Sequence, residues 1–514
     1  MRLPVQSYDL DDPASTASLI NCYVESLPED ARAPYLIKRC PGIKPHVTAT
    51  SFQVGLINGP IRRAMFFEAA QRILIVTEAT HIGNLLDSAY AGPGTILMWV
   101  DSGRQTNTAF NGTATILTTL IDEYAKNIDL DQNADVAIFV TEPNAYTVAT
   151  DGTITILSDT DFTSRGAGDV EFLDNFLLYR EPRSGRFFGS DIGSATVFDP
   201  LKFSTAEAVP DWLVGMQSDH SQLALFGSKS LELWDSTSGR GFPFRRVING
   251  SIEKGCISKD TIALVDDQLF WVADDRTVRT LSGLTPIKVS HSAIDKTLSN
   301  DKLLATTTNA FSYSYDGHSF YVLRGSDYCF VYDVTTGMWH NRKSYGHESW
   351  KFGCSVNAWG NTYFGADVGH DNTVTRSGSS TASATHGIDG YHFGIMDSKT
   401  YDDGDEPMLM QWTYQPVFGA GQRVFHDRME IVLKTGVGNA DITDPTIVLE
   451  WSDDGGQHWK NMPPRSIGKM GQSKNRVVWH GLGSAYDRVY RASIVDPIDV
   501  MVTDTILTAR GGRV

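Results

Sequence analysis

Two nine-residue segments of the chain, 98 residues apart, have nearly the same pattern. Residues 231–239 read LELWDSTSG and residues 329–337 read CFVYDVTTG. Each alternates apolar residues up to an aromatic one and then places Asp, Thr and Gly at the same spacing. Such an echo within one chain predicts a repeat architecture, in which one small unit recurs along the sequence.

The repeated unit is built of short strands. Apolar or alternating runs are cut by Gly, Asp, Asn and Ser throughout residues 55–376, which is typical of strands joined by tight turns. Residue pairs that tolerate a positive φ stand between neighbouring runs, at Asp151-Gly152, Asp266-Asp267 and Asp316-Gly317. Groups of three or four runs recur about every 40–50 residues, the length of a propeller blade. The sequence therefore predicts an all-β fold with a β-propeller of about six or seven blades, in which Trp234 and Tyr332 occupy equivalent positions two blades apart.

The rest of the chain is expected to form three further parts. Residues 1–54 are predicted to pack on the propeller or to close it. Residues 377–400 begin with the small polar run SGSSTASAT and are interpreted as a linker. Residues 401–514 keep the alternating pattern but lose the repeat, which predicts a C-terminal β-sandwich or jelly-roll domain.

The longest interruption of the repeat spans residues 88–133. It is predicted to be an insertion that projects from one face of the propeller. Within it, Leu117, Leu120, Ile121 and Tyr124 have the spacing of one face of a helix, although nearby threonines keep the helix propensity moderate. Other amphipathic helices are scarce in the sequence.

The charge balance limits the classes of partner. The chain carries 44 Lys and Arg against 61 Asp and Glu, a formal net charge of −17. It therefore repels phosphate backbones on average and is not expected to grip nucleic acid, although it could line a path along which DNA slides. No stretch approaches the roughly 18 apolar residues of a membrane span, and no signal peptide opens the chain, so synthesis in a cytosol without export is expected.

The five cysteines predict neither a zinc site nor a disulfide framework. Their number is odd, and no two are spaced as C-x-x-C. Small buried thiols are the expected state, with a single Cys22–Cys40 disulfide as the alternative.

Residues 452–459, SDDGGQHW, fit the Asp-box pattern S-x-D-x-G-x-x-W, with His458 where Thr is usual. Asp-boxes are typical of sialidase propellers, which would suggest a glycosidase. Ser452 and Asp454 can, however, bond to the amides of a turn, and Gly456 can supply a positive φ while Trp459 covers the hairpin. The box is single and lies outside the predicted propeller, so we interpret it as a stabilised turn.

Two acidic runs raise the question of a cation site. Residues 129–135, DLDQNAD, have oxygen ligands at the spacing of a calcium loop, but Ala134 and Val140 stand where that loop needs Gly and Glu. Residues 401–406, YDDGDE, hold the second run, for which a cation or a basic partner surface is the alternative. Both runs are predicted to be solvated loops.

Sequence motifs of enzymatic nucleophiles, zinc proteases and P-loops are absent. Three of the 13 dispersed histidines, His220, His291 and His318, are interpreted as hairpin or core-edge residues. Basic residues cluster only as pairs that could contact acidic partner subunits, at Lys38-Arg39, Arg62-Arg63 and Arg245-Arg246. We therefore predict no enzyme activity, and no catalytic, cofactor-binding or metal-binding residue.

Two short segments near the start of the chain carry a resemblance to a known family. Residues 21–25 read NCYVE and residues 37–43 read IKRCPGI. Together with the propeller and the C-terminal β-domain, they resemble the packaged-DNA stabilisation protein, or tail hub, of short-tailed bacteriophages. In that family an Asn-rich entry segment is followed by an Arg-x-Pro-Gly-like turn, matched here by residues 39–42, and the resemblance extends loosely over most of the chain.

The resemblance implies a structural virion protein without an active site. Several copies, expected as a hexamer, would form a ring below the portal and its adaptor, retain packaged DNA and attach the tail needle and tailspikes. The ring would be assembled in the host cytoplasm and reside in the virion tail, and DNA would pass through it without sequence-specific binding. Two alternatives are a carbohydrate-active, sialidase-like propeller, suggested by the Asp-box, and a kelch-like binding module, suggested by Tyr332-Asp333 followed by Trp339.

Overall fold

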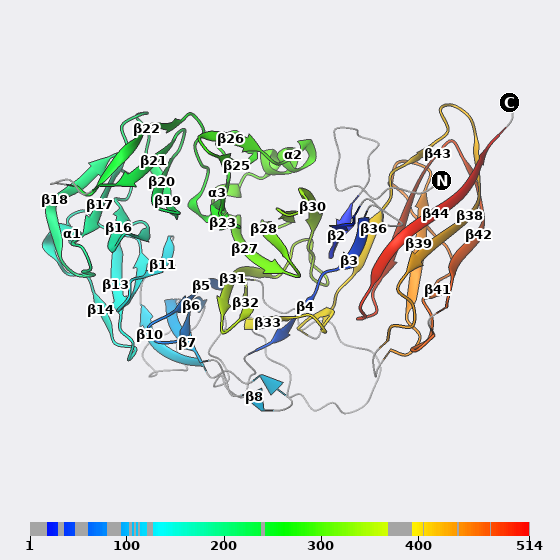
Figure 1. The fold of residues 1–514 in the computed structure, drawn as a ribbon, viewed down its shortest axis with the longest axis horizontal. Helices are drawn as coiled ribbons and strands as arrows, with labels where there is room; N and C mark the ends of the chain where they lie inside the picture. The colour runs from blue at the N-terminus through cyan, green and yellow to red at the C-terminus, as the bar shows by residue number, and fades with distance from the viewer. Residues whose placement is uncertain are drawn as a thin grey trace.

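The computed structural model contains a propeller and a sandwich that lie side by side, with the C-terminus at the outer end of the sandwich (Figure 1). The structure describes residues 18–28, 35–46, 60–79, 94–101, 105–106, 109–110, 114–120, 127–237, 242–367, 393–404, 406–438, 442–472 and 474–512. Nearly all of its regular structure is β-strand, as the sequence predicts.

The propeller is made of seven sheets among the described residues, each an antiparallel run of strands. The first three sheets are β5 (Ile61–Phe67), β6 (Arg72–Ala79), β7 (Gly94–Val100) and β10 (Ala114–Leu120); β11 (Ile128–Gln132), β12 (Ala137–Thr141), β13 (Asn144–Val148) and β14 (Ile154–Ile156); β15 (Val170–Leu173), β16 (Phe176–Arg180), β17 (Arg186–Ser190) and β18 (Phe198–Thr205). The next three are β19 (Leu213–Asp219), β20 (Gln222–Gly227), β21 (Leu231–Ser236) and β22 (Phe244–Ile252); β23 (Ala263–Val265), β24 (Gln268–Val272), β25 (Val278–Ser282) and β26 (Thr285–Lys288); β27 (Asn309–Tyr315), β28 (His318–Arg324), β29 (Cys329–Asp333) and β30 (Met338–Asn341). The seventh is β31 (Phe352–Ala358), β32 (Asn361–Ala366), β33 (Phe393–Asp397) and β4 (Gly42–Pro45).

Contacts between neighbouring sheets close the ring. The first strands β5, β11, β15, β19, β27 and β31 lie around one axis, with η1 (Lys259–Thr261) bridging β19 and β27, and β31 returns to contact β5. One apolar cluster fills each space between adjacent sheets. Aromatic rings make many of these contacts, as where Phe187 meets Trp234 at 5.0 Å and Phe270 stacks on Tyr321 at 5.2 Å. Burial of these apolar faces on both sides of each blade is what holds the propeller together.

The repeat that is visible in the sequence corresponds to equivalent strands. Trp234 lies in β21 and Tyr332 in β29, which are the third strands of the fourth and sixth sheets, so the prediction of a two-blade step is confirmed. The hairpin turns are also confirmed, since Asp266 and Asp267 have φ of 49° and 57°. Asp333 accepts hydrogen bonds from the Thr335 N–H at 3.0 Å and the Thr336 hydroxyl at 2.7 Å and so stabilises its turn. Asp235 instead accepts from Gln222 Nε2 at 2.8 Å, and residues 238–241, with Gly239, lie outside the described residues.

The predicted insertion at residues 88–133 is wrong where the structure describes it. β7 and β10 are the two outer strands of the first sheet, and β11 is the innermost strand of the second. Ile96 and Met98 of β7 are fully buried, because β7 lies inside the blade with both of its faces covered. A long apolar run is typical of such a strand. The helical spacing around Leu117 is wrong for the same reason: Leu117 and Leu120 belong to β10, whereas Ile121 and Tyr124 lie outside the described residues.

The predicted linker at residues 377–400 is wrong at its end. β33 is the third strand of the seventh sheet and pairs with β32. Its other edge pairs with β4 from the N-terminal part of the chain, in the register Met396 with Ile43, so that β4 completes the sheet. The polar run SGSSTASAT interrupts a blade rather than ending it. Residues 81–87 and 372–376 also have the pattern that predicts strands, and both ranges lie outside the described residues.

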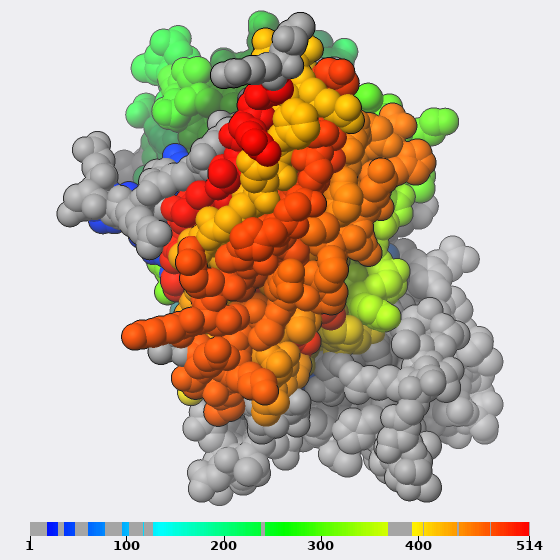
Figure 2. Space-filling model, turned by 90° about the vertical axis from the view of Figure 1, so that its right-hand side faces the viewer, coloured from blue at the N-terminus to red at the C-terminus, as the bar shows by residue number. Residues whose placement is uncertain are grey.

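The sandwich consists of two sheets with a shared core (Figure 1). Its outer face is formed by the C-terminal part of the chain (Figure 2). One sheet contains β2 (Cys22–Ser26), β3 (Tyr35–Arg39), β44 (Met501–Gly511), β38 (Val424–Leu433) and β42 (Val477–Ala485). The other contains β36 (Met410–Thr413), β43 (Asp487–Ile494), β39 (Thr446–Ser452) and β40 (Lys460–Asn461), with β37 (Val417–Phe418) and β41 (Arg465–Ser466) at its edges. Trp412 and Trp479 are fully buried between the two sheets.

The remaining elements are short. They are β1 (Leu19–Ile20), β8 (Gln105–Thr106), β9 (Ala109–Phe110), β34 (Asp402–Asp403), β35 (Glu406–Pro407), α1 (Thr160–Thr163), α2 (Ser292–Asn300) and α3 (Leu304–Thr307). Of the helices in the described ranges, none has the length and apolar composition that a bilayer crossing requires.

Candidate functional site: the junction of propeller and sandwich

The N-terminal part of the chain runs through the boundary between the two bodies. β1 pairs in parallel with β30 of the sixth blade and antiparallel with β36 of the sandwich, so one hydrogen-bonded sheet continues from blade to sandwich. β2 and β3 then form the edge of the other sandwich sheet, and β4 returns to the propeller. A segment of fewer than thirty residues, from Leu19 to Pro45, therefore contributes strands to both bodies.

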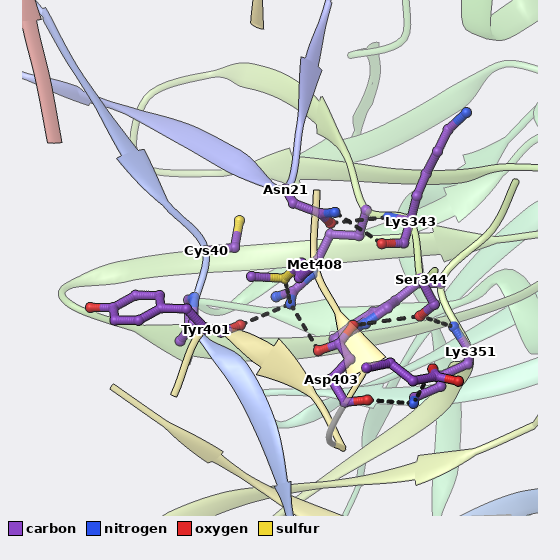
Figure 3. A network of polar contacts seen from close by, with 12 residues as sticks. Asn21, Cys40, Lys343, Ser344, Lys351, Tyr401, Asp403 and Met408 are labelled. Atoms are coloured by element: carbon purple, nitrogen blue, oxygen red, sulfur yellow. Dashed lines mark hydrogen bonds and ion pairs between the residues drawn. The ribbon is translucent and has the colours of Figure 1, made fainter. Parts of the chain in front are cut away.

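Asn21 is the polar centre of this crossing (Figure 3). Its Nδ2 donates to the carbonyls of Lys343 at 2.9 Å and Leu409 at 2.8 Å, and its Oδ1 accepts from the Lys343 N–H at 3.0 Å. The side chain is fully buried and the backbone has φ 53°, a conformation that Asn adopts more readily than other non-glycine residues. One residue thus connects the end of the sixth blade, the N-terminal segment and the start of the sandwich.

Arg39 binds backbone rather than a carboxylate. Its guanidinium donates to the carbonyls of Met408 and Asp496, and more distantly to that of Tyr401 at 3.4 Å, which lie on different segments of the junction. The side chain is 3% exposed, and burial lowers the pKa of Arg39 to about 10. The pKa remains above physiological pH, so a buried positive charge holds these carbonyls together.

Asp403 forms the second polar centre of the junction (Figure 3). Its Oδ2 accepts from Trp350 Nε1 at 3.0 Å, and its backbone carbonyl accepts from Lys351 Nζ at 2.6 Å. Lys351 Nζ also pairs with Glu406 Oε2 at 2.8 Å. Asp403 is 1% exposed and its partner Lys351 2%, so the predicted solvated loop at residues 401–406 is wrong at Asp403; Asp405 lies outside the described residues.

Arg342 completes this centre from the propeller side. Its guanidinium stacks over the Trp350 ring at 4.0 Å and donates to the Pro41 carbonyl at 2.9 Å. Oδ1 of Asp403 lies 3.9 Å from the guanidinium. Nearby, burial lowers the pKa of His340 to about 3, with Arg342 adding to the effect, so the imidazole next to the cation is neutral.

The junction has the chemistry of a structural clamp. Its polar groups bind backbone carbonyls, amides and one another, and the Cys40 thiol beside them is buried, with a pKa raised to about 11 by burial. A nucleophile needs a low pKa and access to substrate, and neither is present at Cys40. The arrangement fixes two rigid bodies relative to each other.

The propeller axis holds a different set of polar groups. Asp129 and Asp131 lie in β11, so the prediction of a solvated loop at residues 129–135 is wrong at these two positions. Their carboxylates accept hydrogen bonds from the Val170 N–H at 3.1 Å and from the Phe172 N–H, both in the next blade. The Glu171 carboxylate in β15 makes the same kind of bond to the following blade, where it accepts a hydrogen bond from the Ser218 N–H at 3.0 Å. Carboxylates therefore join the first strands of consecutive blades.

Salt bridges occupy the same axis. Lys259 Nζ lies 2.9 Å from Asp169 and 3.3 Å from Asp129, and Arg180 Nε lies 2.9 Å from Asp169. Burial alone would raise the pKa of Asp169, but Lys259 and Arg180 outweigh it and lower the pKa to about 2. Arg63 pairs with Asp260 at 2.5 Å. The charged side chains at the axis thus form ion pairs with one another. Within the described ranges, no three His, Cys, Asp or Glu residues are grouped so that they could hold a metal ion.

The Asp-box is a stabilised turn, as predicted. Ser452 Oγ accepts from the Gly456 N–H at 2.9 Å, and Asp454 Oδ1 accepts from the N–H groups of Gln457 and His458, both at 3.0 Å. Gly456 has φ 92°. The Trp459 ring stacks under the Arg491 guanidinium at 3.9 Å. Ser452, Asp454 and Gly456 thus stabilise the hairpin between β39 and β40, whereas Asp453 pairs with Arg488 of β43.

The other predicted residues have structural surroundings. All five cysteines are free and buried, so the buried-thiol prediction is confirmed and the Cys22–Cys40 disulfide is not formed. His220 lies in a hairpin turn with φ 55°, and His318 is buried against Asp333 at 2.8 Å. Of the basic pairs, Lys38 and Arg63 bind Asp316 and Asp260, whereas the pair at 245–246 is exposed on β22.

Sequence reasoning identified the segment of the junction but not its key residues. Residues 21–25 and 37–43 carried the family resemblance, and both are strands of the crossing. Arg342, Trp350 and Asp403 gave no pattern, since they lie at irregular positions far apart in the chain. A signal was available at Asn21, which interrupts an apolar run between Ile20 and Cys22.

Comparisons with known proteins agree with the architecture. Residues 104–366 match the family described as bacteriophage P22 Gp10, β-propeller, and residues 411–509 match bacteriophage P22 Gp10, β-sandwich. No curated protein matches the sequence.

Among solved structures, the chain is similar to a streptogramin B lyase, with 8% identity over 63% of this chain and 93% of that one and a TM-score of 0.38. It is also similar to a computationally designed protein, Ika8, with 13% identity over 69% of this chain and 99% of that one and a TM-score of 0.37. A third is the virginiamycin B lyase of Staphylococcus aureus, with 10% identity over 54% and 97% and a TM-score of 0.35. These scores are too low to carry an argument about function.

The propeller match runs from the outer strand of the first blade, β10, to β32 of the seventh, and the sandwich match runs from β36 into β44, in the order in which the structure has them. The all-β fold, a propeller followed by a sandwich, is therefore confirmed by sequence family and by structure. The chain belongs to the bacteriophage P22 Gp10 family and is a structural protein of a short-tailed phage tail hub.

Proposed function

We propose that several copies of this chain form a ring below the portal and its adaptor, where the ring retains packaged DNA and anchors the tail needle and tailspikes. The observation that carries the proposal is the clamped junction. A hub must hold partners at more than one surface without letting those surfaces move apart. A sheet that continues through β1, with Asn21, Arg39 and Asp403 buried around it, favours such a rigid two-body block.

The charge of the chain supports a role as a passage. A net charge of −17 disfavours adhesion of DNA to the hub, so DNA would pass through the ring without sequence-specific binding. The copy number we propose is six. Assembly would take place in the host cytoplasm, and the mature protein would reside in the virion tail.

We further propose a division of the chain into parts. Residues 55–376, with the strands β4 and β33, make the propeller; residues 401–514, with β1, β2 and β3, make the sandwich. The N-terminal 54 residues are then the connector of the two, and β33, at the end of the stretch 377–400, belongs to the last blade.

The proposal includes the absence of catalysis and of catalytic, cofactor-binding or metal-binding residues. The ion pairs of the propeller axis and the turn role of Asp454 support it, because the groups that a glycosidase would use are engaged in structural bonds. Hydrolysis of sialosides by the purified chain would contradict this part directly.

Light scattering of the purified chain, alone and mixed with the portal adaptor, tests the ring. We expect the mixture to give a particle with several copies of the chain, and electron microscopy to place that particle below the portal. The double variant Asn21→Ala, Asp403→Ala should assemble less, because its propeller and sandwich lose their fixed geometry. The matched control is Leu201→Ala, an exposed residue of β18. A chain that remains monomeric with the adaptor refutes the ring.

A further inference from the structure

The outer end of the sandwich carries an exposed aromatic–arginine tip, which consists of Phe418, Arg423, Phe425, Tyr486 and Arg510. Phe418 is 70% exposed, Tyr486 59% and Phe425 41%. The tip lies where β38 begins and β44 ends, at the C-terminal end of the chain and away from the propeller (Figure 1). Large aromatic residues gathered at one exposed place mark an interaction surface.

The tip is held in a fixed shape. The Gly419 N–H donates to the Tyr486 carbonyl at 3.0 Å, and the Gln422 N–H closes the turn onto Gly419 at 2.9 Å. The Gly512 N–H donates to the Arg423 carbonyl at 2.7 Å. The Arg423 guanidinium lies 5.9 Å from the Tyr486 ring centre, and that of Arg510 lies 5.9 Å from the Phe425 ring centre. These bonds preorganise rings and cations before any ligand arrives.

The chemistry of the tip selects a ligand that is both acidic and apolar. Arg510 pairs with Asp427 at 3.2 Å, whereas no carboxylate of the described residues lies within ion-pair distance of Arg423. Aromatic residues and arginines are enriched at protein interfaces, where rings supply apolar contact and guanidinium groups bind carboxylates. A short peptide with Asp and apolar side chains would satisfy both requirements.

The direction of β1 leads one such peptide to the tip. β1 runs antiparallel to β36, with Leu19 opposite Trp412, and the Thr413 N–H donates to the Ser18 carbonyl at 2.8 Å. Followed backwards from Ile20 to Ser18, the chain therefore points in the direction in which it proceeds from Thr413 to Phe418. Five residues separate those two positions, about 17 Å of extended chain.

The sequence that precedes Ser18 has the required composition. Residues 8–12 read YDLDD and place three carboxylates around Tyr8 and Leu10, from six to ten residues before Ser18. Six residues span up to about 20 Å, which is sufficient to reach the tip from Ser18. We propose that residues 8–12 dock on the aromatic–arginine tip of the same chain, with Asp side chains toward Arg423 and Arg510 and with Tyr8 and Leu10 against the rings. The proposal does not depend on the tail hub assignment.

Photo-crosslinking tests the docking. A photoreactive amino acid is placed at position 418 of the full chain, and the adducts of the dilute protein are mapped by mass spectrometry. We expect adducts within one chain, centred on residues 8–12. The matched control places the same amino acid at position 201, where Leu201 is 80% exposed, and should give no adducts with residues 8–12.

Charge variants test the chemistry of the contact. The triple change Asp9→Asn, Asp11→Asn, Asp12→Asn should lower the adduct yield roughly fivefold to tenfold, as should Arg423→Gln with Arg510→Gln, since each removes about two exposed ion pairs. Lys229→Gln on the propeller is the control and should leave the yield unchanged. Adducts that form only between two chains, or that avoid residues 1–17, overturn the proposal, and so does a yield that none of these Asp and Arg changes lowers.

Discussion

Asn21 offers a direct measure of how strongly the two bodies are joined. We expect Asn21→Gly to lose the three side-chain hydrogen bonds to Lys343 and Leu409 while keeping a residue that accepts φ 53°. Asn21→Ala should lose the same bonds and also strain the backbone. The pair of variants therefore separates the clamp from the conformation of the chain.

The magnitudes follow from the geometry. Each buried hydrogen bond contributes about 1 kcal/mol, so Asn21→Gly should lower the free energy of unfolding by about 3 kcal/mol. The left-handed conformation costs roughly 1 kcal/mol more for Ala, so Asn21→Ala should lose about 4 kcal/mol. Loss at this level would uncouple the bodies, and the sandwich would then unfold separately from the propeller.

Urea unfolding followed by tryptophan fluorescence provides the assay, because Trp412 and Trp479 report on the sandwich and Trp271 on the propeller. Asn249 is the matched control: it has φ 60° but is exposed, so Asn249→Ala should lose only the conformational part. If Asn21→Gly lowered stability by less than about 1 kcal/mol, or if Asn21→Ala matched Asn249→Ala, the clamp would not depend on Asn21.

Three further predictions concern titration and the Asp-box. Burial and Arg488 lower the pKa of the His426 imidazole to about 4, whereas the imidazole of the unfolded chain is protonated below about pH 6.5. The contribution of His426 to stability should therefore be complete above pH 6.5, and the free energy of unfolding should fall by about 3 kcal/mol between pH 6.5 and 4. Urea titrations of the His426→Leu variant should not show this loss. Burial, with Asp129, raises the pKa of Asp131 to about 7, so the contribution of Asp131 to stability is greatest below pH 3.8 and declines as the pH rises to 7. The Asp131→Asn variant should therefore gain stability relative to the parent chain as the pH rises from 4 to 8. A difference in stability between the two chains that stays the same over this range would disprove the raised pKa. Asp454→Ala should speed hydrogen exchange at the Gln457 and His458 amides by about tenfold while leaving the propeller amides unaffected, and equal exchange in both chains would contradict its turn role.

The repeat was predictable because it is local. Alternating strands and two-residue turns are encoded within ten or twelve residues, so β27 to β30, and the equivalence of Trp234 and Tyr332, could be inferred from pattern alone. The errors arose where the pattern was interrupted. The run GTILMWV of β7 lies near the start of the stretch 88–133, in which the regular spacing of runs is lost, and FGIMD of β33 follows a polar run. The sequence therefore places one strand in an insertion and the other in a linker.

The junction was not predictable because its parts meet only in three dimensions. Asp403 belongs to an acidic run that resembles a solvated loop, and only the approach of Trp350, Lys351 and Arg342 makes it a buried partner. In the same way Asp129 and Asp131 have the spacing of a calcium loop, but that spacing is also the alternation of one face of a strand. Sequence spacing alone does not distinguish these cases.

The pairing of β3 with β44 determines when the sandwich sheet can be completed during folding. Ile37 pairs with Val502, so strands separated by most of the chain must meet before the sandwich sheet is complete. The last blade has the same requirement, because β4 must wait for β33. Blades whose strands are consecutive can fold as they are synthesised, whereas the last blade must wait for β33 and the sandwich sheet must wait for β44. A chain truncated before β44 would leave β3 as an exposed edge strand. Such a chain should aggregate or be degraded in the cell instead of entering an assembly.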